Sequence, residues 1–241
     1  MKEIEVVIAS SEFAHYAEEI SFQMEESAKA RGTGIAKRPP EYLVQKMEEG
    51  KAIIAFTKEG DWVGFCYIET WQHGKFVANS GLIVHPNFRN SGAAKAIKAR
   101  AFELSRTKYP EAKIIGITTS LAVMKINSEL GYEPTTFSEL PVDEAFWKGC
   151  KSCVNYDVLT RTERKHCLCT GMIFKPDWEK KKLEKEITQK QEEIELVDEA
   201  ENHEKWNFLK DLKVVERLKN IKEKMFLKLN PLTANAGIRS R

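Results

Sequence analysis

One segment near the middle of the chain constrains its fold more than any other. Residues 75–84 predict a buried strand that Pro86 ends, and Ser91 opens a run of helix-forming residues that extends to Lys108. Only a short loop separates the two elements. The segment therefore predicts a strand, a tight loop and a long helix in direct succession.

The first turn of this helix is suited to binding a phosphate group. The first amides of a helix have no partner within it, and they carry a partial positive charge. Gly92, Ala93 and Ala94 have small side chains or none, so a pyrophosphate can approach these amides, and Arg89 adds a cation nearby. Small residues at a helix start also occur for packing reasons alone, so the interpretation needs support from the rest of the chain.

The order of the other elements indicates one mixed sheet with helices packed on it. Strands are expected at residues 4–9, 52–56, 62–70, 75–84 and 114–118, with weaker candidates at Phe137, 155–159 and 168–174. Helices are expected at about residues 11–29, 41–49, 91–108 and 121–130. The fold class is therefore α/β or α+β. We expect this domain to occupy residues 1–177 and a charged, helical or partly disordered tail to occupy residues 178–241.

Two motifs in this order resemble a known family. The pattern Arg89-x-x-Gly92-x-Ala94 after an apolar strand resembles the pyrophosphate loop of the GNAT N-acetyltransferases, Gln/Arg-x-x-Gly-x-Gly/Ala. The run from Asn127 to Tyr132, Asn-Ser-Glu-Leu-Gly-Tyr, is similar to the end of the next helix in that family. The resemblance covers about residues 4–134. It implies a GNAT-like mixed central sheet flanked by helices, and an N-acyltransferase that uses acetyl-CoA or another acyl-CoA such as succinyl-CoA. A Gly-x-Gly-x-x-Gly motif after the first strand and a Walker loop are both absent.

The same resemblance implies which residues bind the acyl donor. The backbone of Leu82, Ile83 and Val84 would pair with the pantetheine arm, and the amides of Asn90, Ser91, Gly92, Ala93 and Ala94 would hold the pyrophosphate. Members of the family often have a tyrosine four residues before the glycine that ends the second helix, as proton donor to the thiol. This chain has Asn127 there, which can bind the cofactor but cannot donate a proton in that role. Ser128, a water molecule and Tyr132 are the alternatives, and the general acid stays unassigned.

A base is also required, because a lysine-like amine has a pKa near 10.4 and is mostly a protonated, unreactive ammonium at neutral pH. Glu69, at the end of the strand before the cofactor strand, is the first candidate. His73 and His85 are alternatives, since an imidazole titrates near neutral pH. The competing interpretations are an ordinary exposed carboxylate for Glu69 and a strand cap for His85.

The acceptor is expected to be a small-molecule amine, and the loop between the first two helices suggests its charge. Arg31, Lys37 and Arg38 surround this loop, and arginine binds carboxylates bidentately. Segments 31–42 and 149–172 resemble the N-acetylglutamate synthase-like subgroup, which implies acyl transfer to glutamate in arginine biosynthesis. The alternatives are a solvated basic loop, an N-acetyltransferase of proteins or peptides, and a non-catalytic acyl-CoA-binding or zinc-stapled interaction protein.

Four cysteines form a second constellation, Cys150-x-x-Cys153 and Cys167-x-Cys169. Two close pairs of thiolates can surround a structural Zn²⁺ ion tetrahedrally. The thirteen residues between Cys153 and Cys167 can form a connecting hairpin, so we expect a cysteine-rich β extension over residues 145–172. Buried free cysteines and a redox pair are the alternatives.

Charge and hydropathy exclude other classes of protein. The net charge is +2, so no overall basic field favours nucleic acid or a membrane surface. No apolar run approaches the roughly 18 residues that span a bilayer, and the N-terminus lacks a signal-peptide core, so we expect a cytoplasmic protein. Residues 179–228 are rich in Lys, Glu, Leu and Ile. Leu183, Ile187 and Ile194, and then Leu218, Ile221, Met225 and Leu229, would line helical faces for self-association, or the tail is simply solvated.

Overall fold

The computed structural model describes residues 3–32, 38–178, 187–190 and 213–229. The chain divides into two compact units, Met1–Pro176 and Asp177–Arg241. The first unit contains the sheet and the helices that pack on it, and the second contains the helix α8.

The first unit is built on one seven-stranded sheet in the order β1-β2-β3-β4-β5-β7-β6. The strands are β1 (Ile4–Ile8), β2 (Ala52–Thr57), β3 (Trp62–Trp71), β4 (Phe76–Val84), β5 (Lys113–Thr118), β6 (Glu133–Thr135) and β7 (Thr170–Phe174). All neighbouring pairs are antiparallel except β4 and β5, which are parallel. The expected mixed sheet flanked by helices is therefore confirmed, with β6 as a strand that the sequence analysis did not anticipate.

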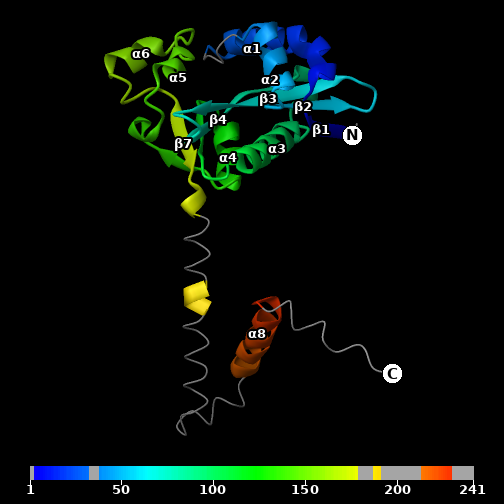
Figure 1. Cartoon of the computed structure of the whole chain (residues 1–241), viewed down its shortest axis with the longest axis vertical. Helices are drawn as coiled ribbons and strands as arrows, with labels where there is room; N and C mark the ends of the chain where they lie inside the picture. The colour runs from blue at the N-terminus through cyan, green and yellow to red at the C-terminus, as the bar shows by residue number, and fades with distance from the viewer. Residues whose placement is uncertain (1–2, 33–37, 179–186, 191–212, 230–241) are drawn as a thin grey trace. The chain divides into compact units, whose positions relative to one another are not determined.

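Helices cover both faces of this sheet (Figure 1). The helices are η1 (Ser11–Tyr16), α1 (Ala17–Arg31), α2 (Pro40–Glu48), η2 (Pro86–Phe88), α3 (Ala93–Lys108), α4 (Leu121–Glu129), η3 (Phe137–Glu139), α5 (Glu144–Lys148) and α6 (Tyr156–Arg161). Successive side chains of a strand point to opposite faces. Phe65 and Tyr67 of β3 accordingly pack with α1 and α2, whereas Cys66 and Ile68 pack with α3.

The parallel pair β4 and β5 stays together for only part of its length. Phe76–Ala78 pair with Lys113–Ile115, after which β5 pairs with β7 alone. Beyond this point β4 carries a bulge, because Tyr67 lies opposite Ser80 whereas Phe65 lies opposite Ile83. Gly81 in the bulge has φ of 66°, and a Cβ atom there would lie 2.3 Å from the ring of Tyr67. Since a bulge bends its strand, the outer halves of β4 and β5 diverge.

The structure corrects the expectation for the cysteine-rich segment. Residues 155–159 were expected as a strand within a hairpin, but Tyr156–Arg161 form the helix α6. An ion pair between Asp157 and Arg161, one helical turn apart, fits this conformation. Phe137, the other weak strand candidate, begins the 3-10 helix η3. The segment therefore contains two short helices joined by turns, and it reaches the sheet only in β7.

In the second unit, Lys213–Leu229 form α8, and residues 187–190 are also helical. Ile187 and Ile221 are exposed. Leu183 and Ile194 lie outside the described residues, as do the side chains of Met225 and Leu229. Within the described ranges, no helix is both long and apolar enough to cross a bilayer.

A buried hydrogen-bonded network links β4 to α3 and to the segment after α4. The Tyr132 hydroxyl donates to Asn79 Oδ1 at 2.8 Å, and Asn79 Nδ2 donates to Ser105 Oγ at 3.1 Å. Ser105 Oγ in turn donates to the Ala101 carbonyl at 2.8 Å. Buried polar groups that lack partners cost free energy. This network therefore holds β4 in place at the point where it separates from β5.

We expect Tyr132→Phe to lower the free energy of unfolding by about 1–3 kcal/mol, because it leaves the Asn79 amide oxygen buried without a donor. Tyr109→Phe is the matched control, since no hydrogen bond joins the Tyr109 hydroxyl to the described residues. Urea denaturation of both variants measures the difference. Equal stability of the two variants would show that the network contributes nothing.

Candidate active site

A cleft of about 890 Å³ occupies the divergence between β4 and β5. Its wall is formed by both strands, by the end of β3, by α4 and by residues at the start of α2. The main lining residues from these elements are Arg38, Tyr42, Tyr67, Glu69, Trp71, Asn79, Ser80, Gly81, Leu82, Gly116, Ile117, Thr118 and Asn127. The cleft is therefore bounded by the strand that precedes the loop at residues 89–94 and by the strand that follows α3.

The loop after β4 presents unpaired backbone amides. Asn90 and Gly92 have φ of 64° and 86°, and α3 begins at Ala93. The first helical hydrogen bonds run from the amides of Lys95 and Ala96 to the Gly92 carbonyl, so the amides of Ser91, Gly92 and Ala94 donate to none of the described residues. A Cβ atom at Gly92 would meet nothing within 4 Å. The loop thus offers open, positively polarised amides to an anion.

The residues expected to bind coenzyme A lie partly beside this loop and partly in the cleft. The exposed Arg89 lies next to the loop, where its Nη2 donates to Ser27 Oγ at 3.4 Å. Leu82 and Asn127 line the cleft. Ile83 is only 4% exposed and packs in the core on the α1 and α2 side, and Val84 packs against the core on the α3 side. Their backbones alone are candidates for contacts with a ligand.

The Glu69 carboxylate and the Arg38 guanidinium both lie in the part of the cleft near α2. The Tyr42 hydroxyl donates to Glu69 Oε1, and Arg38 Nε donates to the Tyr67 hydroxyl at 2.7 Å. The Arg38 guanidinium also lies over the Tyr42 ring at 5.4 Å. Burial, and then the hydrogen bond to Glu69, raise the pKa of Tyr42, so its phenol stays protonated and orients the carboxylate.

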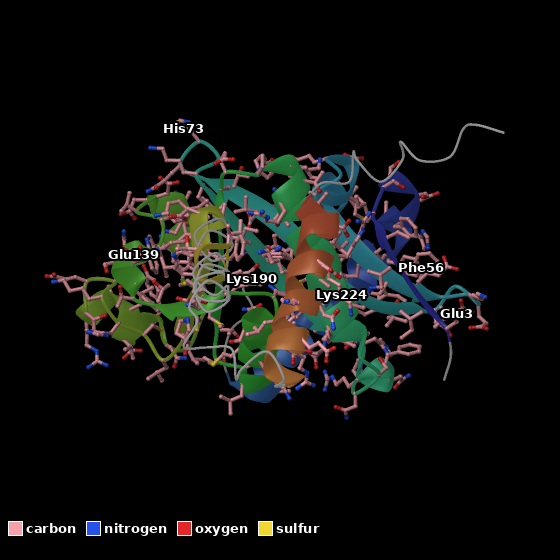
Figure 2. The ribbon with its side chains drawn as sticks, turned by 90° about the horizontal axis from the view of Figure 1, so that it is seen from below. Glu3, Phe56, His73, Glu139, Lys190 and Lys224 are labelled. Carbon is pink, nitrogen blue, oxygen red and sulfur yellow. The ribbon has the colours of Figure 1, made fainter. Side chains whose placement is uncertain are left out.

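The other candidate acids and bases lie elsewhere. His73 is exposed in the turn between β3 and β4, and Figure 2 shows it pointing away from the body of the domain. His85 Nδ1 accepts from the Asn87 amide at 3.3 Å, as expected of a cap, and the residue lies outside the cleft lining. The Ser128 side chain is exposed, and the Tyr132 hydroxyl donates a hydrogen bond to Asn79 Oδ1. Among the sequence candidates for acid or base, Glu69 is therefore the one that the cleft contains.

Of the two expected acceptor-binding arginines, Arg38 lines the cleft, whereas the side chain of Arg31 lies outside the described residues, as does Lys37. The sequence analysis missed Tyr42, Tyr67, Trp71 and Lys148, which also line it. Trp71 contributes a buried indole N–H without a hydrogen-bond partner among the described residues. A signal was present, because Tyr67, Glu69 and Trp71 alternate along β3 and therefore point to one face.

The four cysteines lie near one another, beside the cleft. Cys150, Cys153 and Cys169 belong to its lining, and all four thiols are free. Burial is the main cause that raises the pKa of Cys150 to about 11 and that of Cys169 to about 12. Within the described ranges, no group of three or more His, Cys, Asp or Glu side chains is arranged to hold a metal ion. The structure thus gives no support to the expected zinc site.

A comparison with protein families finds a match to part of this chain. Residues 18–122 match the model of the Acetyltransferase (GNAT) family. These residues include β4, the loop at residues 89–94 and the start of α4. No curated protein sequence matches the chain.

Solved structures of other proteins share the fold. N-acetylglutamate synthase from Neisseria gonorrhoeae, complexed with coenzyme A and N-acetyl-glutamate, matches with a TM-score of 0.52 and 15% identity, over 73% of this chain and 35% of that chain. This chain therefore spans about a third of the length of the Neisseria enzyme. Rv2747 from Mycobacterium tuberculosis, in complex with CoA and NLQ, matches with a TM-score of 0.52 and 13% identity, over 71% of this chain and 98% of that chain.

We expect Gly92→Asp to weaken the binding of coenzyme A by about ten-fold or more, because a carboxylate at the helix start repels the pyrophosphate. Gly92→Asn is the matched control, since it adds a neutral side chain of the same shape that tolerates the left-handed conformation. Isothermal titration calorimetry measures both affinities. Wild-type affinity in the aspartate variant would remove the loop from the binding site.

Proposed function

We propose that this chain is an acetyl-CoA-dependent acetyltransferase of the GNAT family that acetylates the α-amine of a small acidic amino acid such as glutamate. The observation that carries the proposal is the presence of Glu69 and Arg38 in one cleft, oriented by Tyr42 and Tyr67. An amino acid carries both an amine and a carboxylate, and these two side chains complement that pair of groups.

Several donors near Glu69 favour an acidic acceptor. The terminal nitrogens of Arg38 make no hydrogen bond to the described residues, so they are available to a carboxylate. The indole N–H of Trp71 is buried without a partner, and Lys148 adds a second cation to the lining. A neutral or basic acceptor would leave these groups unsatisfied, which costs free energy.

Glu69 is positioned to accept the proton that the attacking amine loses. Its carboxylate is half-buried at the end of β3, and the Tyr42 hydroxyl holds one of its oxygens. The other oxygen remains available to the amine or to a water molecule that contacts it. The name of the Neisseria relative, N-acetylglutamate synthase, gives further support to glutamate as the acceptor and to a role in arginine biosynthesis.

A panel of acceptors tests the proposal through the release of free thiol from acetyl-CoA. We expect glutamate or aspartate to be acetylated, and Arg38→Met to raise the KM of that acceptor about ten-fold or more without changing the KM of acetyl-CoA. Arg100→Met, which removes a guanidinium on α3 outside the cleft lining, is the control. Thiol release with peptides and with none of the amino acids would instead favour a peptide N-acetyltransferase.

Glu69→Gln is expected to lower kcat by about 10²–10⁴-fold, because the amide keeps the shape of the side chain but cannot accept the proton. The KM of acetyl-CoA should stay near its wild-type value. Glu103→Gln makes the same change on the exposed side of α3 and should leave kcat unchanged. Steady-state kinetics at saturating acceptor decide the matter, and full activity of Glu69→Gln would assign the base elsewhere.

A further inference from the structure

A lysine of α3 reaches the cleft from the face of the sheet opposite to Arg38. Lys98 is only 2% exposed and ranks among the largest fully buried side chains of the described residues. It is also the one residue of α3, a helix described over its whole length, that lines the cleft. The other buried side chains of α3, such as Ile97 and Ala101, pack against the sheet instead.

Nothing in the described structure neutralises this buried ammonium. It makes no hydrogen bond or ion pair with the described residues, and its Nζ atom lies 5.5 Å from the centre of the Tyr132 ring. Burial lowers the pKa of Lys98, since a charge removed from water without a partner is unfavourable. A ligand in the cleft that accepts a hydrogen bond would supply the missing partner.

A second unpartnered group lies in the same cleft wall. Asn127 of α4 is 1% exposed, and its Oδ1 atom is buried without a hydrogen-bond donor among the described residues. Its Nδ2 atom contacts Met172 Sδ at 3.5 Å. Lys98 and Asn127 thus offer a donor and an acceptor to one ligand. A thiol has the complementary groups, because its sulfur accepts a hydrogen bond and its S–H donates one.

We propose that Lys98 is the proton donor to the sulfur of coenzyme A when the thioester breaks. The proposal rests on the proposed acetyltransferase function and assigns an acid for which Asn127 is unsuited. The amine nitrogen forms a bond to the thioester carbonyl carbon, and the carbon–sulfur bond then breaks with its electron pair on sulfur. Sulfur takes a proton from the Lys98 ammonium, and Glu69 takes one from the amine. The products are an amide and a thiol, and both side chains regain their protonation states by exchange with water in the cleft.

The titratable neighbours of Lys98 are suited to this role. Cys66 faces it from β3, and Tyr132 faces it from the segment after α4. Burial raises the pKa of Cys66 to about 11, and burial also raises the pKa of Tyr132 well above its usual value. Both neighbours therefore stay neutral near neutral pH, so neither places a negative charge beside Lys98.

Kinetics of Lys98→Met and Lys98→Arg test the role of the proton. We expect both substitutions to lower kcat by about 10²–10⁴-fold at nearly unchanged KM for acetyl-CoA. Arginine retains the charge, but its pKa is too high for it to donate a proton at the pH of the assay. Wild-type kcat in Lys98→Arg would overturn the proposal in favour of a purely electrostatic role. Lys108→Met, which removes an exposed ammonium at the end of the same helix, is the control.

A second measurement needs no acceptor and therefore separates this proposal from the proposed function. The ultraviolet absorbance of the thiolate is followed against pH for coenzyme A bound to the wild type and to Lys98→Met, with desulfo-coenzyme A as the blank. An ammonium next to the sulfur should lower the pH of ionisation by about one to three units in the wild type. Identical titrations, or failure of the wild type to bind coenzyme A, would overturn the role of Lys98. If the ionisation of bound coenzyme A is shifted as expected but the protein acetylates no amine, the proposed function is refuted and the role of Lys98 is not.

Discussion

The bulge in β4 separates two strands that would otherwise stay hydrogen-bonded, and the whole site depends on this separation. Parallel pairing with β5 ends at Ala78 and Ile115, and the bulge at Gly81 bends β4 beyond that point. Gly81 can take the required left-handed conformation, and it leaves room for the Tyr67 ring against its backbone. The cleft is thereby lined by residues from both faces of the sheet.

The opening brings together side chains from opposite faces of the sheet. Arg38 and Tyr42 reach it from the side of α2, where Tyr67 and Glu69 of β3 complete a polar cluster. Lys98 reaches it from α3 on the other side. A thioester held between the strands would meet a base on one face and an ammonium on the other. This separation keeps the two groups from neutralising each other in an ion pair.

Sequence predicts the local features of this protein well because they depend on neighbouring residues. The loop at residues 89–94 and most strands and helices follow from short patterns of small, β-branched and helix-forming residues. The segment between Cys153 and Cys167 was misjudged, because cysteine spacing does not distinguish a hairpin from the helix α6. Lys98 was overlooked, since a lysine in a helix rich in lysine and arginine is normally solvated. Its burial results from contacts with β3 and Tyr132, which are distant in sequence.

A crystal structure of the complex with coenzyme A tests the central claim most directly. The account predicts pantetheine density between residues 79–82 of β4 and 116–118 of β5, with the pyrophosphate on the amides of residues 90–94. The sulfur should lie within hydrogen-bonding distance of Lys98 Nζ, and the thioester position should lie between Lys98 and Glu69. Coenzyme A bound outside the divergence of β4 and β5, or strands that remain closed against it, would contradict the account.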